Sequence, residues 1–439
     1  MSKLINRRRF LSSAAASVAV AGAWPVLGQD VLRTPTTAPG KKLKIGIVGV
    51  GGRGYSHVRE IAAIGNANVI ALCDVDSERL ASAATKIPAA ARFADFREML
   101  RLPGLEAVVV STPDHTHAVA TAAALRAGKH VYCEKPLTHT VAEARAITKL
   151  AGETGLVTQL GIQIHALDNY RRVVELIRAG AIGTVDQVHI WHERTNRPID
   201  ATPTEPPATL DYDLWLGPVP HRPYLKGFHP YNWRRWWAFG SGLLGDIGAH
   251  FMDVAFWALD LRTPSRVEAS GPAPSAEFTE AGVVAKYEFP ARDGKPAVRL
   301  AWYDAPSFPP IRSELKIDEK FLREGVLFVG QDGMLFTNYQ RHILLPQEQF
   351  RDFKRPTTTI ASSPGHQQEW INACLAGDPQ AASCPFSYGG PLTEAALLGT
   401  IAYRCGKPLE WDAQNLRFPN APEAERHLSS AYREGWTLS

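Results

Sequence analysis

A glycine-rich turn between an apolar run and a helix constrains the fold of this chain most. Residues 45–48, Ile-Gly-Ile-Val, lead directly into Gly49-Val50-Gly51-Gly52-Arg53-Gly54. The spacing is Gly-x-Gly-x-x-Gly, and Asp74 ends the next apolar run, 20 residues after Gly54. Strand, turn, helix and acidic residue in this order predict a dinucleotide-binding unit of the Rossmann type.

Each residue of this turn has a physical role in the prediction. Gly49 permits the tight turn, Gly51 lets the backbone approach a pyrophosphate, and Gly54 allows close packing of helix on strand. The helix N-terminus stabilises the phosphate charge. Asp74 accepts hydrogen bonds from the adenosine ribose, and its charge repels a 2′-phosphate, which favours NAD. Arg53 could pair with that phosphate, so NADP stays possible.

Strand-like and helix-like runs alternate along the first third of the chain. The expected strands span 44–48, 69–73, 107–110, 130–133 and 157–164, and the expected helices span 55–64, 78–85, 96–100, 118–127 and 141–152. Continuous apolar strands separated by helices predict a doubly wound parallel sheet, covered on both faces. We assign residues 43–164 to this domain.

The regular alternation of strands and helices ends after this domain. Helices at 170–178 and 246–259 accompany alternating strands at 185–192, 283–289, 297–303, 325–329 and 333–337. These runs predict a second α/β domain, residues 165–439, with a largely antiparallel sheet that serves substrate binding and self-association.

The N-terminus predicts export. Asn6-Arg7-Arg8-Arg9-Phe10-Leu11 precedes the small apolar run 12–23, as in a twin-arginine signal peptide. That run is shorter than the roughly 20 residues that span a membrane. We expect a signal peptide at 1–29, a linker at 30–42, and a periplasmic protein with no stable membrane insertion after cleavage. The periplasm offers no free NAD pool, so the cofactor should be tightly bound and exported with the folded chain.

Composition excludes several other classes. The net charge is +4, with several of the positive charges in the leader, so no nucleic-acid-binding surface is indicated. The five cysteines have no Cys-x-x-Cys spacing, which predicts neither a disulfide framework nor a thiolate metal site. A bridge between Cys374 and Cys384 stays open. Cys73 and Cys133 are expected to be buried.

Four further segments carry a family resemblance. Ser-Thr-Pro-Asp-His-Thr-His at 111–117, the Glu-Lys-Pro segment within 127–137, Leu-Ile-Arg-Ala-Gly-Ala-Ile-Gly at 176–183, and Gly-Asp-Ile-Gly-Ala-His at 245–250 resemble the glucose–fructose oxidoreductase/inositol dehydrogenase/MocA (Gfo/Idh/MocA) family. The resemblance implies a Rossmann domain followed by an open-faced sheet domain, oxidation or reduction of sugars and polyols, and assembly into dimers or tetramers. Within the family, glucose–fructose oxidoreductases are exported with bound cofactor.

The resemblance also implies roles for individual residues. Lys135 contacts the substrate hydroxyl and the nicotinamide ribose, and His250 exchanges the hydroxyl proton. Asp246, four residues before His250 and on the same helix face, either orients the histidine or binds a substrate hydroxyl. The other implied cofactor-binding residues are Thr112, Pro113, His117 and Glu134.

The segment from Trp191 to Trp257 holds six of the eleven tryptophans. Flat aromatic faces suit the C–H faces of sugars, so Trp233 and Arg234 are predicted substrate contacts. The alternative is that these rings pack a long loop onto the second domain.

A metal site is the rival use of the Asp246–His250 pair, with His165, His192 and Glu193 as further ligands. These residues lie on separate segments, and no metal is predicted.

The leading hypothesis is an exported NAD(P)-dependent oxidoreductase that acts on a sugar, polyol or glycoside by hydride transfer. One alternative is redox-neutral lysis or hydrolysis of a glycoside through transient oxidation. The other is a dinucleotide-loaded protein that binds sugars without catalysis.

Overall fold

The first domain is built on a six-stranded parallel sheet. The computed structural model describes residues 40–195 and 199–438, so the predicted signal peptide and most of the predicted linker lie outside the described residues. The strand order is β3-β2-β1-β4-β5-β6, with all neighbours parallel. The strands are β1 (Leu43–Val48), β2 (Ala67–Cys73), β3 (Ala91–Phe93), β4 (Ala107–Val110), β5 (His130–Glu134) and β6 (Thr158–Gly161). This order reverses at β1, which places the ligand crevice at the carboxyl ends of β1 and β4.

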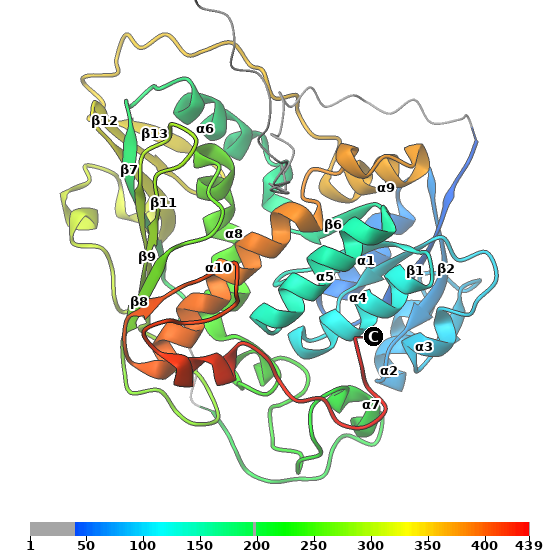
Figure 1. The fold of residues 1–439 in the computed structure, drawn as a ribbon. Helices are drawn as coiled ribbons and strands as arrows, with labels where there is room; N and C mark the ends of the chain where they lie inside the picture. Colours follow the sequence, from blue (N-terminus) through cyan, green and yellow to red (C-terminus); the bar gives the residue numbers. More distant parts are fainter. Residues whose placement is uncertain (1–39, 196–198, 439) are drawn as a thin grey trace, which may run out of the picture.

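Helices connect these strands and cover both faces of the sheet (Figure 1). They are α1 (Arg53–Ala62), α2 (Ser77–Ala84), α3 (Phe96–Met99), α4 (Asp114–Arg126) and α5 (Val141–Thr154). Local sequence sets their ends: Thr140 and Glu143 form a capping box at the start of α5, and Gly155 ends it with φ 62°.

The second domain contains an eight-stranded sheet of order β13-β12-β11-β7-β10-β9-β8-β14. Among the described residues, β7 and β10 run parallel and the other neighbours run antiparallel, as predicted. The strands are β7 (Val185–His192), β8 (Arg266–Ser270), β9 (Val284–Phe289), β10 (Val298–Asp304), β11 (Glu324–Gly330), β12 (Gly333–Thr337), β13 (His342–Leu345) and β14 (Leu409–Glu410).

Helices α8 and α10 cover one face of this sheet and also reach the first domain (Figure 1). α10 packs on both α5 and α8, and α9 returns to the first sheet, where Trp370 packs edge-on against Tyr132. The remaining helices are α6 (Asp168–Arg178), α7 (Tyr212–Leu216), α8 (Gly242–Leu259), α9 (His366–Ala376) and α10 (Phe386–Cys405), with 3₁₀ turns η1 (Gln163–Ala166), η2 (Asn232–Arg235), η3 (Pro310–Glu314), η4 (Glu319–Phe321), η5 (Pro379–Ala381) and η6 (Pro422–His427).

Three predicted boundaries were wrong by three or four residues, and one of them is the start of the helix expected at 118–127, which begins at Asp114 as α4. The strand expected to reach Ile164 ends at Gly161, because the chain turns into η1 and directs Gln163 back onto Glu134, with an Nε2–Oε1 distance of 2.6 Å. The helix expected to begin at Asp246 begins at Gly242, one turn earlier.

All five cysteines are free, so the bridge between Cys374 and Cys384 is not formed. Within the described residues, no helix is both long and apolar enough to cross a membrane.

Candidate active site

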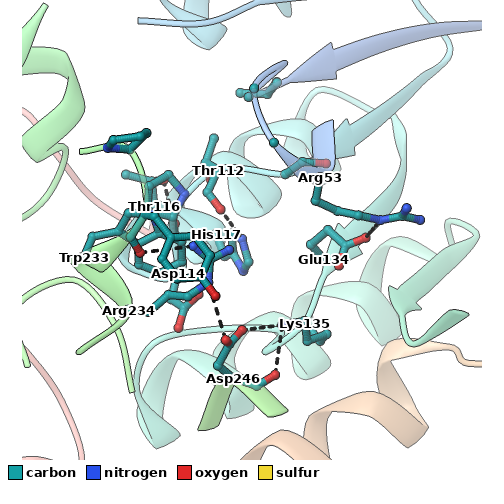
Figure 2. Close-up of a pocket in the computed structure, with 18 of the residues that line it drawn as sticks. Arg53, Thr112, Asp114, Thr116, His117, Glu134, Lys135, Trp233, Arg234 and Asp246 are labelled. Carbon is teal, nitrogen blue, oxygen red and sulfur yellow. Dashed lines mark hydrogen bonds and ion pairs between the residues drawn. The ribbon is translucent and has the colours of Figure 1, made fainter. Parts of the chain in front are cut away.

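A cavity of about 640 Å³ lies at the carboxyl ends of the first sheet (Figure 2). Loops after β1, β2, β4 and β5 form one wall, and η2, α8, β7 and β11 contribute the other. Every predicted site residue lines it except Gly54. An added Cβ at Gly54 would stand 1.7 Å from the Gly49 carbonyl oxygen, so this glycine provides close packing beneath the cavity.

The glycine turn is held in place by Asp74. Gly49 has φ 77°, and its N–H donates to Cys73 O at 2.8 Å. The Asp74 carboxylate accepts hydrogen bonds from the N–H groups of Val50 and Asp76, at 2.8 and 2.9 Å. Burial nevertheless raises the pKa of Asp74, against the effect of these hydrogen bonds.

The loop after β4 adds two hydroxyl groups suited to a ligand. Ser111 Oγ and Thr112 Oγ1 are buried without a hydrogen-bond partner in the protein, and both residues line the cavity. Buried polar groups normally have partners, so a bound polar ligand is the natural acceptor or donor. The glycine turn, Asp74 and these hydroxyls therefore fit a dinucleotide.

Arg53 faces Glu134 (Figure 2). Its Nε lies 3.2 Å from Glu134 Oε1, and its Nη1 lies 3.2 Å from Glu60 Oε1. Glu134 also contacts His57 Nε2 at 2.7 Å. Burial opposes ionisation of Glu134, but the hydrogen bond from His57 and the charge of Arg53 hold its pKa well below the usual range.

Arg79 is the arginine near Asp74, and sequence reasoning missed it. Its Nε lies 3.3 Å from Asp76 Oδ2, and an added Cβ at Gly51 would stand 2.0 Å from its Nη1. The signal was available, because Arg79 follows Asp74 by five residues in α2.

Lys135 forms an ion pair with the buried Asp246, although they lie 111 residues apart (Figure 2). The Lys135 ammonium donates to the Asp246 carboxylate and to its backbone carbonyl, the latter at 2.9 Å. Arg234 Nε lies 3.4 Å from the second carboxylate oxygen. Burial alone would raise the pKa of Asp246, but the charges of Lys135 and Arg234 lower it to about 2. Asp246 is therefore ionised at neutral pH.

His250 lies one turn after Asp246 on α8 and lines the same cavity. Its Nδ1 is buried with no hydrogen-bond partner in the protein. Burial and the positive charge of Lys135 lower the pKa of His250 to about 3. The ring is therefore neutral at neutral pH. Asp246 was expected either to orient His250 or to bind a substrate hydroxyl. Its hydrogen bonds go to Lys135 and not to His250, so they do not support the first of these roles.

Asp114 is a second residue that sequence reasoning missed. It begins α4, is 2% exposed, and accepts a hydrogen bond from Ser241 Oγ at 3.3 Å. Burial and the negative charge of Asp246 raise the pKa of Asp114 to about 8. The carboxyl group is therefore protonated at neutral pH beside an ionised one. It stands within the motif at 111–117, which was the available signal.

His117 joins the loops after β4 and β5. Its Nε2 lies 2.8 Å from the Thr112 carbonyl oxygen and its Nδ1 lies 2.7 Å from that of Pro136. Burial lowers the pKa of His117, so the neutral ring donates one of these hydrogen bonds at a time.

The tryptophans mainly pack, as the alternative interpretation held. Trp215 and Trp236 lie in a buried cluster with Phe228 and Phe239. Trp233 belongs to this cluster and also lines the cavity, where the Arg234 guanidinium lies 4.2 Å from its ring centroid. Of the six tryptophans in this segment, Trp215 and Trp233 line the cavity.

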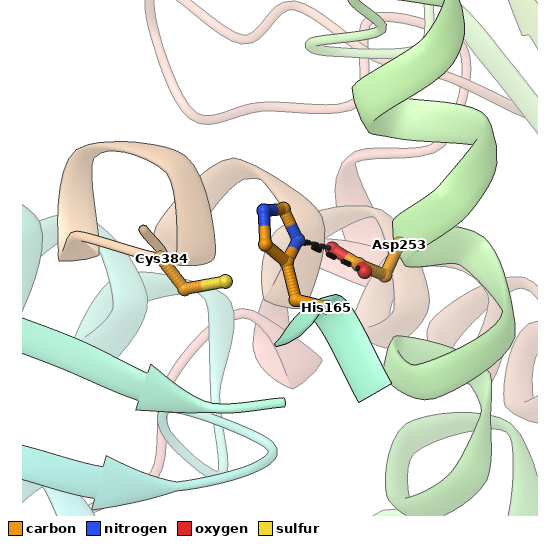
Figure 3. Close-up of side chains that lie close together, drawn as sticks. All are labelled: His165, Asp253 and Cys384. Carbon is orange, nitrogen blue, oxygen red and sulfur yellow. Dashed lines mark hydrogen bonds and ion pairs between the residues drawn. The ribbon is translucent and has the colours of Figure 1, made fainter. Parts of the chain in front are cut away.

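The histidines considered above as metal ligands do not lie together in one site. His192 pairs with Glu324, with a distance of 3.2 Å from Nε2 to Oε2. His165 instead lies with Asp253 and Cys384, with one donor atom of each within 4.8 Å of the others (Figure 3). Asp253 already accepts hydrogen bonds from His165 Nδ1 at 3.0 Å and from Tyr388 OH at 2.7 Å. Hydrogen bonding therefore accounts for the contact between His165 and Asp253.

Known proteins resemble both domains. Residues 43–162 match a model described as "Oxidoreductase family, NAD-binding Rossmann fold", and residues 177–298 match its C-terminal α/β domain. Inositol 2-dehydrogenase of Salmonella paratyphi B is 30% identical over 182 residues, 40% of this chain and 54% of that protein. The chain therefore aligns with about half the length of this relative.

Solved structures share the fold over most of the chain. GenD2 from gentamicin A biosynthesis, in complex with NAD, has a TM-score of 0.61 at 20% identity, covering 87% of this chain and 99% of that one. An aldose-aldose oxidoreductase from Caulobacter crescentus has a TM-score of 0.58 at 19% identity, covering 84% and 100%. Together the two matched domains cover more than half of the chain, which belongs to the Gfo/Idh/MocA oxidoreductase family and carries its NAD-binding domain.

Proposed function

We propose that this protein is an NAD-dependent oxidoreductase that acts on a hydroxyl group of a sugar, polyol or glycoside. One observation carries the proposal: a neutral histidine with an unpartnered Nδ1 lies in the same cavity as the Lys135 ammonium and a dinucleotide turn. Inositol 2-dehydrogenases and an aldose-aldose oxidoreductase among the similar proteins support a polyhydroxylated substrate.

Bound NAD supplies the acceptor for the hydride that leaves the substrate carbon. His250 accepts the hydroxyl proton at a ring nitrogen, because the neutral ring carries an unshared electron pair. The Lys135 ammonium donates a hydrogen bond to the substrate oxygen and stabilises the negative charge that develops there. Asp246 fixes the position of Lys135 and is itself paired with Arg234, and Trp233 lines the cavity beside them.

Export and tight cofactor binding are part of the same proposal. The twin-arginine motif supports secretion of the folded protein to the periplasm. With no NAD pool there, turnover must regenerate the cofactor in place, either by coupling oxidation of one sugar to reduction of another or by a redox-neutral cycle. Self-association through the second sheet completes the proposal, and light scattering of the purified protein would give its order.

The deciding experiment begins with purification of the mature protein from the periplasm, followed by denaturation and identification of released nucleotide by mass and absorbance. Stoichiometric NAD(H), together with turnover of sugar pairs or glycosides without added NAD, is the expected result. An empty protein that turns over only with added NAD would refute internal regeneration. Loaded protein with no turnover of any sugar, polyol or glycoside would favour the non-catalytic binding protein.

A further inference from the structure

The C-terminal tail, defined here as residues 429–438, reaches the dinucleotide cavity from the far end of the chain. In Figure 1 it is the red segment that runs past α7 and ends beside α3 and α4. Trp436, near its end, lines the cavity together with residues of the glycine turn. The Trp436 ring has no part in the hydride transfer proposed above.

Trp436 stands at the adenosine end of the cavity. In a Rossmann unit the acidic residue after β2 marks the adenosine ribose, and here that residue is Asp74. Asp74 N donates to Phe93 O at 3.1 Å, so the next turn of chain, Asp95 and Phe96, lies beside it. The Trp436 ring centroid is 6.1 Å from that of Phe96, and both side chains line the cavity.

Two arginines hold the tail in this position. Arg97 lies over the Trp436 ring, with its guanidinium carbon 4.7 Å from the centroid, and is itself held by Asp95 at 2.6 Å. Arg433 donates to Gly217 O and to Asp213 O, both at 2.6 Å, and pairs with the Asp213 carboxylate at 2.5 Å. The tail therefore bridges α3 and α7, the two elements that flank this end of the cavity.

We propose that the C-terminal tail retains bound NAD by holding Trp436 over the adenosine end of the cavity. The proposal rests on the proposed function, because a retained cofactor is what an exported oxidoreductase requires. Stacking of an aromatic side chain on a nucleobase contributes about tenfold to hundredfold in binding. The Arg433 contacts add a kinetic barrier, since they hold the tail and its Trp436 ring in place while NAD dissociates.

The test uses the full-length mature protein and the substitution Trp436→Ala, with Leu438→Ala as matched control. Leu438 is an apolar residue of the same tail that does not line the cavity. The rate of NAD release is followed by exchange against labelled NAD, and the thermal midpoint of each NAD-free protein is measured alongside. We expect W436A to release NAD about tenfold or more faster, and L438A to release it at the wild-type rate.

A second variant distinguishes the contribution of the Trp436 ring from that of the Arg433 contacts. Arg433→Ala keeps Trp436 but removes the contacts to α7, and it should also speed release, with a smaller effect on the affinity at equilibrium. Equal release rates in wild type, W436A and R433A would overturn the proposal while leaving the oxidoreductase function standing. A changed thermal midpoint in W436A with unchanged release would also overturn it and make the tail purely structural. Wild-type protein that binds no NAD would instead refute the proposed function.

Discussion

The ion pair between Lys135 and Asp246 gives the sharpest test of the site. Asp246→Asn keeps the shape of the side chain but removes the charge that faces Lys135 and Arg234, whose side chains are 13% and 27% exposed. A carboxyl pKa that falls from 3.8 to about 2 corresponds to about 2 kcal/mol of stabilisation at pH 7. Because the folded pKa is the lower one, this contribution is present above pH 4 and is lost as the pH falls toward 2.

Removal of one partner also leaves the other charge buried. Breaking a buried pair in this way costs about 3–5 kcal/mol, so D246N and Lys135→Met should each destabilise the protein by about 3 kcal/mol. The double variant should lose less than the two single losses combined, by a coupling energy of about 2 kcal/mol. The assay is urea unfolding at pH 7 of the NAD-free protein, followed by fluorescence, for the wild type and all three variants.

A surface pair serves as the matched control. Lys149 and Glu153 lie one helical turn apart on α5 at 3.7 Å, with side chains 78% and 58% exposed. Their cycle, with Lys149→Met and Glu153→Gln, should give a coupling of about 0.5 kcal/mol or less. If the Lys135–Asp246 cycle gives a coupling no larger than this control, the ionised, desolvated pair described above is refuted.

Three further outcomes follow from the site. Since the pKa of His250 is lowered to about 3, kcat/KM for oxidation should stay level from pH 7.5 to 5.5. With a histidine of ordinary pKa, kcat/KM would fall about tenfold at pH 5.5. The substitution His250→Gln should lower kcat by about 10²–10⁴ at every pH. Since the pKa of Asp114 is raised to about 8, its contribution to stability is complete below pH 4 and falls as the pH rises through 8. The thermal midpoint of the wild type should therefore fall with pH between pH 6 and 9, and Asp114→Asn should remove this dependence. Gly54→Ala places a Cβ 1.7 Å from the Gly49 carbonyl and should abolish NAD binding by calorimetry, whereas Gly65→Ala, with no atom within 4 Å of its Cβ, should leave it unchanged.

Local sequence patterns predicted the first domain well because each of its signals is short-range. The strand β1, the glycine turn and Asp74 lie within 32 residues, and a hydrogen bond between Val50 N and Asp74 Oδ2 closes the unit. α10 gave no such signal. It packs against α5, α8 and the second sheet, so its apolar residues surround the helix and produce no one-sided periodicity.

The same limit of local sequence patterns applies to the site residues. Lys135, Asp246 and His250 were identified through the family resemblance, and spacing alone gave only the shared helix face of the last two. Trp436 escaped because nothing within its own segment reveals that it faces the cavity, and Arg79 was overlooked although it follows Asp74 by only five residues. Their positions depend on where α2 and the C-terminal tail fold back onto the glycine turn and α3. Such long-range placement is fixed by packing and not by local pattern.

The ion pair also couples the two domains. Lys135 leaves the first sheet after β5, whereas Asp246 and His250 belong to α8, which is packed on β7 and β10 of the second sheet. A movement that separated these elements would break the contact between Lys135 and Asp246 and would expose His250 to water. Exposure would remove the desolvation that keeps the imidazole neutral. The contact between the two domains therefore keeps the His250 ring neutral, and the Lys135–Asp246 pair is one of the interactions that hold the domains together there.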